Sequence, residues 1–89
     1  MRVLDCGNVS SEDEFWDLYI SEICPEGADL FGRNLDAFWD ALSGGPGWPG
    51  DGEIVLKNSA HLAPLRDGHF LESLRQVARG SETIKVTFA

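Results

Sequence analysis

Three short segments of aliphatic and β-branched residues, set apart by stretches of helical periodicity, limit the folds that this chain can adopt. The segments are RVLDC at residues 2–6, EIVLK at 53–57 and TIKVTF at 83–88. Strands that are separated by helices are most economically parallel, with right-handed crossovers. We therefore expect an α/β fold with a three-stranded parallel sheet packed by about four helices, in the order strand, helices, strand, helices, strand.

Two helices are expected in the first half of the chain. Ser11 and Glu14 have capping-box spacing, which predicts the start of a helix that ends at Pro25. The apolar stripe of this helix is wide, so the helix should be well buried. Asn34 is a favourable N-cap for a second helix that runs to Ser43, where two glycines follow.

The second half of the chain is expected to alternate in the same way. Residues 44–52 contain five glycines and two prolines, which predicts an irregular connection that is the most exposed in the chain. The strand at 53–57 is apolar enough to be covered on both faces. One helical turn near residues 58–64 should precede a last helix that Asp67 can cap and that Gly80 stops.

The length of the chain allows one domain, residues 1–89, with one modest core. The longest apolar runs are three residues, which predicts no membrane-spanning helix, and the first residues lack the apolar block of a signal peptide. A cytoplasmic location is therefore the expectation. Cys6 and Cys24 are too few for a disulfide scaffold and are expected to be reduced thiols.

Fifteen acidic residues against seven basic ones give the chain a formal net charge of −8. Nucleic acid and anionic membranes are thereby disfavoured as partners, because each encounter would begin with repulsion. A cationic partner is favoured. An acidic surface that serves only solubility remains the alternative, since charge alone does not decide between the two.

The helix expected at residues 34–43 has a core side and an acidic side. On a helical wheel, Leu35, Phe38, Trp39 and Leu42 form an apolar arc. Asp36 and Asp40 cluster roughly 130° from the centre of this arc. Asp36 lies in the first turn, where the helix dipole stabilises a carboxylate, whereas Asp40 lies beyond that reach and has no cation three or four residues later. The pair is either a binding feature or a solvated face.

The stretch FGRNLDAFWDALSG, residues 31–44, resembles the signature of the barstar family, the intracellular inhibitors of barnase-type ribonucleases. The family pattern is an aromatic, Gly, any residue, Asn-Leu-Asp-Ala, an apolar residue, Trp-Asp, any residue, Leu, Ser or Thr, and Gly. Chain length, order of elements and the closing apolar strand agree with the family as well. The resemblance implies a barstar-like fold and one-to-one inhibition of a basic, secreted, guanyl-specific microbial ribonuclease by a protein that is monomeric when free.

The resemblance also implies which residues meet the enzyme. Asp40 would be the main contact among the phosphate-binding arginines and catalytic histidine of the ribonuclease, with Asp36 beside it. The other partner-binding positions that it implies are Asn34, Leu35, Ala37, Trp39, Ser43 and Gly44. Further candidate contacts around them are Leu30, Phe31, Gln76 and Trp48.

Several positions depart from the best-known member of the family. Leu30 and Gly45 stand where that member has aromatic residues, and Gln76 stands where it has an acidic one. These changes remove peripheral contacts and bear on the identity of the target. Trp48 is expected either to replace the missing aromatic from the long loop or to pack within that loop.

Two other functions remain alternatives. The chain could be an immunity protein for a different basic nuclease toxin, which the changes at Leu30 and Gln76 favour. It could also be a small metal- or thiol-dependent hydrolase, but His61 and His69 have no Cys or paired carboxylate at ligand spacing. We therefore expect no enzymatic activity, no cofactor and no metal.

Overall fold

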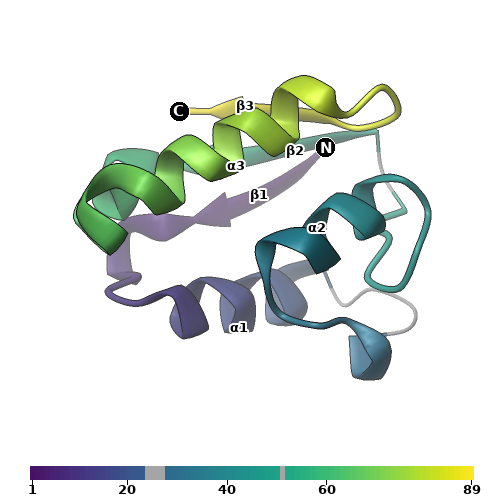
Figure 1. The fold of residues 1–89 in the computed structure, drawn as a ribbon, viewed down its shortest axis with the longest axis horizontal. Helices are drawn as coiled ribbons and strands as arrows, with labels where there is room; N and C mark the ends of the chain where they lie inside the picture. The colour runs from purple at the N-terminus through teal and green to yellow at the C-terminus, as the bar shows by residue number, and fades with distance from the viewer. Residues whose placement is uncertain (24–27, 51) are drawn as a thin grey trace.

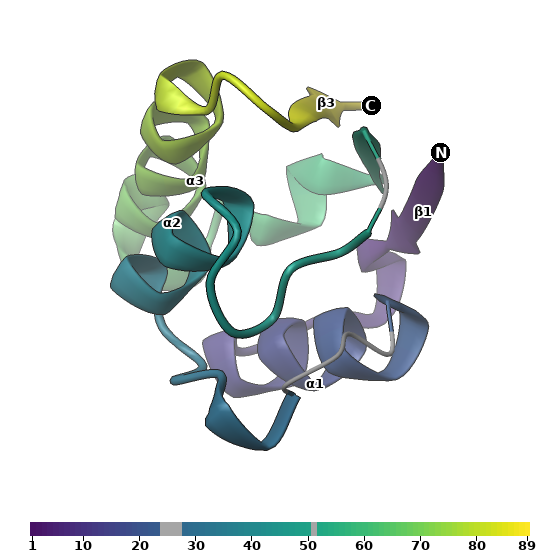
Figure 2. The same ribbon diagram turned by 90° about the vertical axis from the view of Figure 1, so that its right-hand side faces the viewer.

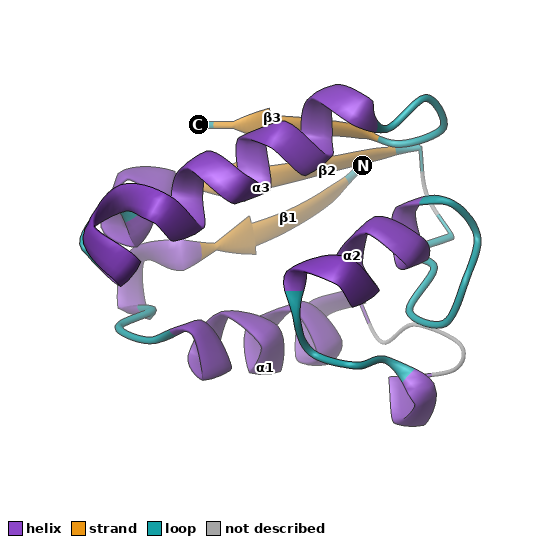
Figure 3. Ribbon diagram, in the orientation of Figure 1, coloured by secondary structure: helices purple, strands orange, loops and turns teal. Residues whose placement is uncertain are grey.

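A three-stranded parallel sheet runs through the structure (Figures 1 and 3), a computed structural model that describes residues 1–23, 28–50 and 52–89. The strands β1 (Arg2–Asp5), β2 (Glu53–Lys57) and β3 (Lys85–Phe88) lie in the order β1-β2-β3. Both pairings are parallel, and their register aligns Leu4 with Leu56 and Leu56 with Phe88. The predicted parallel sheet is confirmed.

The three α-helices that the structure describes are α1 (Glu12–Ile23), α2 (Leu35–Leu42) and α3 (His69–Gly80). Figure 2 shows the strands along one side of the molecule and these helices on the other. Leu4, Ile54 and Leu56 point toward the helices and are buried, whereas Val3, with the opposite orientation, is 43% exposed. The expectation that the strand at 53–57 is covered on both faces is therefore wrong, because no described helix covers the second face.

The helix count is lower than the four expected. The turn near residues 58–64 is a 3-10 segment, Ser59–Leu62, which follows Asn58 in the left-handed conformation and ends before Pro64. A proline has no backbone N–H to continue a hydrogen-bonded ladder, so this segment stays short. The other described 3-10 segments are Cys6–Asn8, Ala28–Leu30 and Leu65–Gly68.

The predicted start of α1 is confirmed, whereas the predicted cap of α3 is not. The Ser11 hydroxyl accepts a hydrogen bond from the Glu14 backbone N–H at 3.2 Å, which confirms the cap of α1. The Glu14 carboxylate accepts from the backbone N–H of Ser10 at 2.9 Å, one residue earlier than a capping box requires. Asp67 does not cap α3, since its own φ of 54° is left-handed and Gly68 occupies the N-cap position. The predicted end of the first helix at Pro25 lies outside the described residues.

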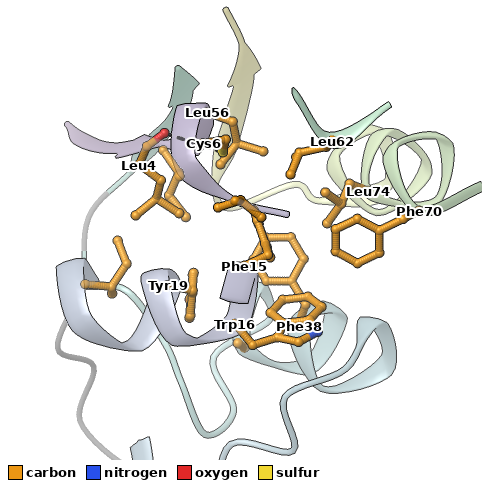
Figure 4. Packing of buried hydrophobic residues seen from close by; sticks show 14 of the residues in the cluster. Leu4, Cys6, Phe15, Trp16, Tyr19, Phe38, Leu56, Leu62, Phe70 and Leu74 are labelled. Atoms are coloured by element: carbon orange, nitrogen blue, oxygen red, sulfur yellow. Dashed lines mark hydrogen bonds between the residues drawn. The ribbon is translucent and has the colours of Figure 1, made fainter. Parts of the chain in front are cut away.

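An aromatic cluster joins the three helices (Figure 4). Trp16 of α1 lies with its ring centroid 4.9 Å from that of Phe15 and 5.7 Å from that of Phe38 of α2. Its distances to Phe31, before α2, and to Phe70 of α3 are both 5.8 Å. All five rings are buried. One side chain thus packs against residues from every helix and from the segment that leads into α2.

The connection between α2 and β2 folds back onto this core. Gly47 and Pro49 are buried, and Trp48 is half-buried against the core. The buried Tyr19 hydroxyl donates a hydrogen bond to the carbonyl oxygen of Gly47 at 2.7 Å. The connection is irregular, as predicted, and its ends are exposed, but its middle is buried because a carbonyl in this loop pairs with a polar group inside the core.

A graded series of Gly→Ala substitutions tests this packing. At Gly47 the φ is +93°, and an added Cβ would lie 2.6 Å from Cδ1 of Phe31, so we expect at least about 2 kcal/mol of destabilisation. Gly44 has φ +102° but open space around it, so its substitution should cost about 1 kcal/mol from backbone strain alone. Gly52 has neither constraint and should change stability by less than about 0.5 kcal/mol. Urea unfolding measures all three, and equal effects would contradict the buried loop.

Candidate partner-binding surface

Both ends of α2 are fixed by local hydrogen bonds. The Asn34 side chain accepts from the backbone N–H of Ala37 at 2.8 Å and donates to the carbonyl oxygen of Gly32 at 3.2 Å. At the other end, Gly44 takes up the left-handed conformation, and the backbone N–H of Gly45 donates to the Asp40 carbonyl oxygen at 2.8 Å. The predicted N-cap and glycine stop are confirmed, and they make this short helix a well-defined platform.

The buried side of α2 consists of Phe38, Ala41 and Leu42, each at most 1% exposed. Trp39 is 42% exposed, so it does not belong to the core arc in which the helical wheel placed it. Ala41 is buried although the wheel left it outside that arc. Positions 38, 41 and 42 have the i, i+3, i+4 spacing of one helix face, and the larger ring at position 39 projects beside that face.

Asp36 and Asp40 lie on the exposed part of α2. Neither carboxylate forms a hydrogen bond or salt bridge with any of the residues that the structure describes. Two nearby arginines are engaged elsewhere, because Arg33 pairs with Asp17 and Arg66 donates to Glu12 at 2.7 Å. The two carboxylates, one helical turn apart, therefore present uncompensated negative charge to solvent.

The family of the chain follows from comparison with known proteins. The model of the family described as Barstar (barnase inhibitor) matches residues 1–88. The chain belongs to the barstar family. No curated protein matches the sequence. The family match extends far beyond the fourteen-residue signature and agrees with a parallel α/β fold across the chain.

The barstar family consists of barnase inhibitors, so membership supports an inhibitory function and argues against an enzymatic one. A thiol-dependent hydrolase would need a reactive cysteine. Cys6 is fully buried, and burial, with a smaller contribution from the charge of Asp5, raises the pKa of its thiol to about 11. A thiol of this kind stays protonated at neutral pH and is a poor nucleophile. Cys24 lies outside the described residues.

The histidines give no sign of a metal centre. His61 and His69 are both exposed. Among residues 1–23, 28–50 and 52–89, no three His, Cys, Asp or Glu side chains are grouped so that they could hold a metal ion. The same part of the chain has no helix long and apolar enough to cross a membrane.

The other predicted contact residues divide by exposure. Ser43, Gly44 and Asn34 are exposed at the two ends of α2, and Leu35 and Ala37 are half-buried along it. Leu30 is 76% exposed in the segment before α2, and Gln76 is exposed on α3.

Two of the predicted contact residues, Phe31 and Trp48, pack against the hydrophobic core. Phe31 is 5% exposed and packs on Trp16 and Tyr19, so it supports the surface from below and does not offer a free ring. Trp48 is half-buried and packs against the hydrophobic core, and its role in partner binding stays a prediction.

Removal of the cap on α2 tests how firmly the platform is held. Asn34→Ala leaves the backbone N–H of Ala37 without its side-chain acceptor and should lower the free energy of unfolding by about 1 kcal/mol. Asn8→Ala is the matched control, because Asn8 is exposed and its side chain has no partner among the described residues. Urea denaturation provides the measurement. If both variants have the same stability, the cap does not hold α2.

Proposed function

We propose that this protein inhibits a basic, secreted microbial ribonuclease by covering its active site in a one-to-one complex. The observation that carries the proposal is the pair Asp36 and Asp40, exposed on a capped helix and free of any cation from the described residues. In this complex Asp40 lies among the phosphate-binding cations of the enzyme, and Asp36 lies beside it. Membership of the barnase-inhibitor family supports the same conclusion.

The physical basis is mimicry of RNA phosphates by carboxylates. A ribonuclease holds its substrate with fixed cations, and a carboxylate can occupy those positions while offering no bond to cleave. A capped helix that is packed on the core loses little conformational freedom on binding, which favours affinity. A buried charge is costly unless its partner is in place, so the surface should reject proteins that lack matched cations.

The proposal extends to cellular context. A net charge of −8 makes two copies of the chain repel each other, which supports a monomer when the protein is free. We place the protein in the cytoplasm, where it would protect the producing cell from its own ribonuclease before secretion. It needs no cofactor in this function, because binding alone blocks the enzyme.

An inhibition assay tests the proposal directly. The protein is mixed with each member of a panel of secreted guanyl-specific bacterial ribonucleases, and RNA cleavage is followed. We expect at least one enzyme to be inhibited at a molar ratio close to one. If the protein inhibits no member of a broad panel, the proposal is wrong.

Asp40 should dominate the binding energy. Truncation of one member of a desolvated charge pair costs about 2–5 kcal/mol, a range to which the barnase–barstar complex itself contributed, so Asp40→Ala should weaken inhibition at least about thirtyfold. Glu22→Ala is the matched control, since Glu22 is exposed on α1, has no partner among the described residues and removes the same charge. Equal small effects of the two variants would mean that the acidic side of α2 is only solvated.

The rate of association should depend on salt. Charges that steer an encounter act over the Debye length, which shrinks from about 30 Å at 0.01 M salt to about 10 Å at 0.1 M. We expect the association rate constant, measured by stopped-flow mixing, to fall steeply over this range while the dissociation rate constant changes little. A salt-independent association rate would contradict steering by the acidic surface.

A second candidate is an immunity protein for another basic nuclease toxin. The observation that favours it lies at the edge of the surface, where Leu30 is 76% exposed and Gln76 brings no charge. Such an edge suits a target whose cations are arranged differently from those of barnase. Capture of the partner from the native organism, followed by assays of RNA and DNA cleavage, separates the two candidates by naming the enzyme that is bound.

A further inference from the structure

The C-terminal end of α3 lies directly against the exposed tryptophan of α2. A Cβ added at Gly80 would lie 2.5 Å from Cζ3 and 2.6 Å from Cη2 of Trp39. These two atoms form the outer edge of the six-membered ring of the indole. The ring can therefore occupy its position only because residue 80 has no side chain.

The usual reason for a glycine at a helix end does not apply here. Glycine commonly ends a helix because it adopts the left-handed conformation. Gly80 is the last residue of α3, but it is not among the glycines with positive φ, and Ser81 follows it as an extended C-cap. Alanine would form this last turn better than glycine as far as the backbone is concerned. The contact with Trp39 is therefore the feature that accounts for glycine at this position.

This contact determines how the indole is presented. With its Cζ3–Cη2 edge against α3, the opposite end of the ring system, which carries the Nε1–H donor, points away from Gly80. That donor has no hydrogen-bond partner among the described residues, and the side chain remains 42% exposed. Trp39 also lies next to Asp40 in sequence, so a partner that reaches Asp40 approaches the same ring.

We propose that Gly80 is a positioning residue for the partner-binding surface, holding Trp39 so that its face and its Nε1–H are offered beside Asp40. The inference rests on the proposed function. Gly80 acts without touching the partner, and its effect passes entirely through the indole. A partner with a basic side chain for Asp40 can then stack part of that side chain on the ring, an arrangement that tryptophan favours over other aromatic residues.

The test is Gly80→Ala, with Gly52→Ala as the matched control at a glycine that has open space and no positive φ. The far end of Trp39 is free to move because the ring is partly exposed, so the added methyl group should displace the indole and leave α3 folded. We expect Gly80→Ala to weaken inhibition of the ribonuclease found in the panel assay about tenfold, and Gly52→Ala to leave it unchanged. The thermal stability of Gly80→Ala should not fall along with its inhibition of the ribonuclease, since alanine is a better helix former than glycine.

The same substitution in a Trp39→Phe background isolates the mechanism. A phenyl ring lacks the outer edge that meets residue 80, so Gly80→Ala should then change the dissociation constant less than about twofold. In the wild-type background, Gly80→Ala should change the tryptophan fluorescence because it displaces the indole of Trp39. This change should be absent when Trp39 is replaced. These two readouts would not respond in this way if Gly80 served only the stability of α3.

The outcomes separate this inference from the proposed function. If the wild-type protein inhibits no ribonuclease, both are overturned. If it does, but Gly80→Ala inhibits equally well or weakens inhibition to the same extent with and without Trp39, only the role of Gly80 is overturned. Loss of inhibition that depends on Trp39, together with the fluorescence change, supports the positioning role.

Discussion

The packing of Trp16 is the interaction on which the rest of the structure depends. Its ring contacts aromatic residues from α1, from the segment before α2, from α2 itself and from α3. The helices α1, α2 and α3 are separate in the sequence, and this cluster brings their rings into one place. In a chain of 89 residues, which can build only a modest core, a single buried aromatic group of this kind accounts for much of the orientation of the helices.

The candidate partner-binding surface is a consequence of this core. Two like charges one turn apart destabilise a helix by a few tenths of a kcal/mol, whereas full burial of a side chain such as Phe38 contributes about 1.5–3 kcal/mol. Packing therefore exceeds repulsion, and α2 can keep Asp36 and Asp40 exposed without a counter-ion from the described residues. Since Arg33 and Arg66 are paired with acidic residues of α1, the charge of α2 remains available to a partner.

The absence of side chains at particular glycines matters as much as the side chains themselves. Gly47 lies so close to Phe31 that the loop can enter the core and receive the hydrogen bond from Tyr19. Gly80 lets the indole of Trp39 rest against α3. In each case one backbone segment approaches an aromatic ring more closely than a side chain at that position would permit. These contacts connect the loop and α3 to the surface of α2.

The sequence by itself determined the parallel α/β fold, the caps of α2, the acidic pair and the family signature, because these depend on local spacing and on residue types along short segments. Only the tertiary structure decided that Trp39 faces outward and Ala41 inward, and that no described helix covers one face of the sheet. It also decided that the loop after α2 is partly buried and that Gly80 lies against Trp39. Each of these depends on which distant segment lies opposite a residue. Periodicity gives the relative positions of side chains around one helix or strand, but the partner against which they pack is fixed only when the whole chain has folded.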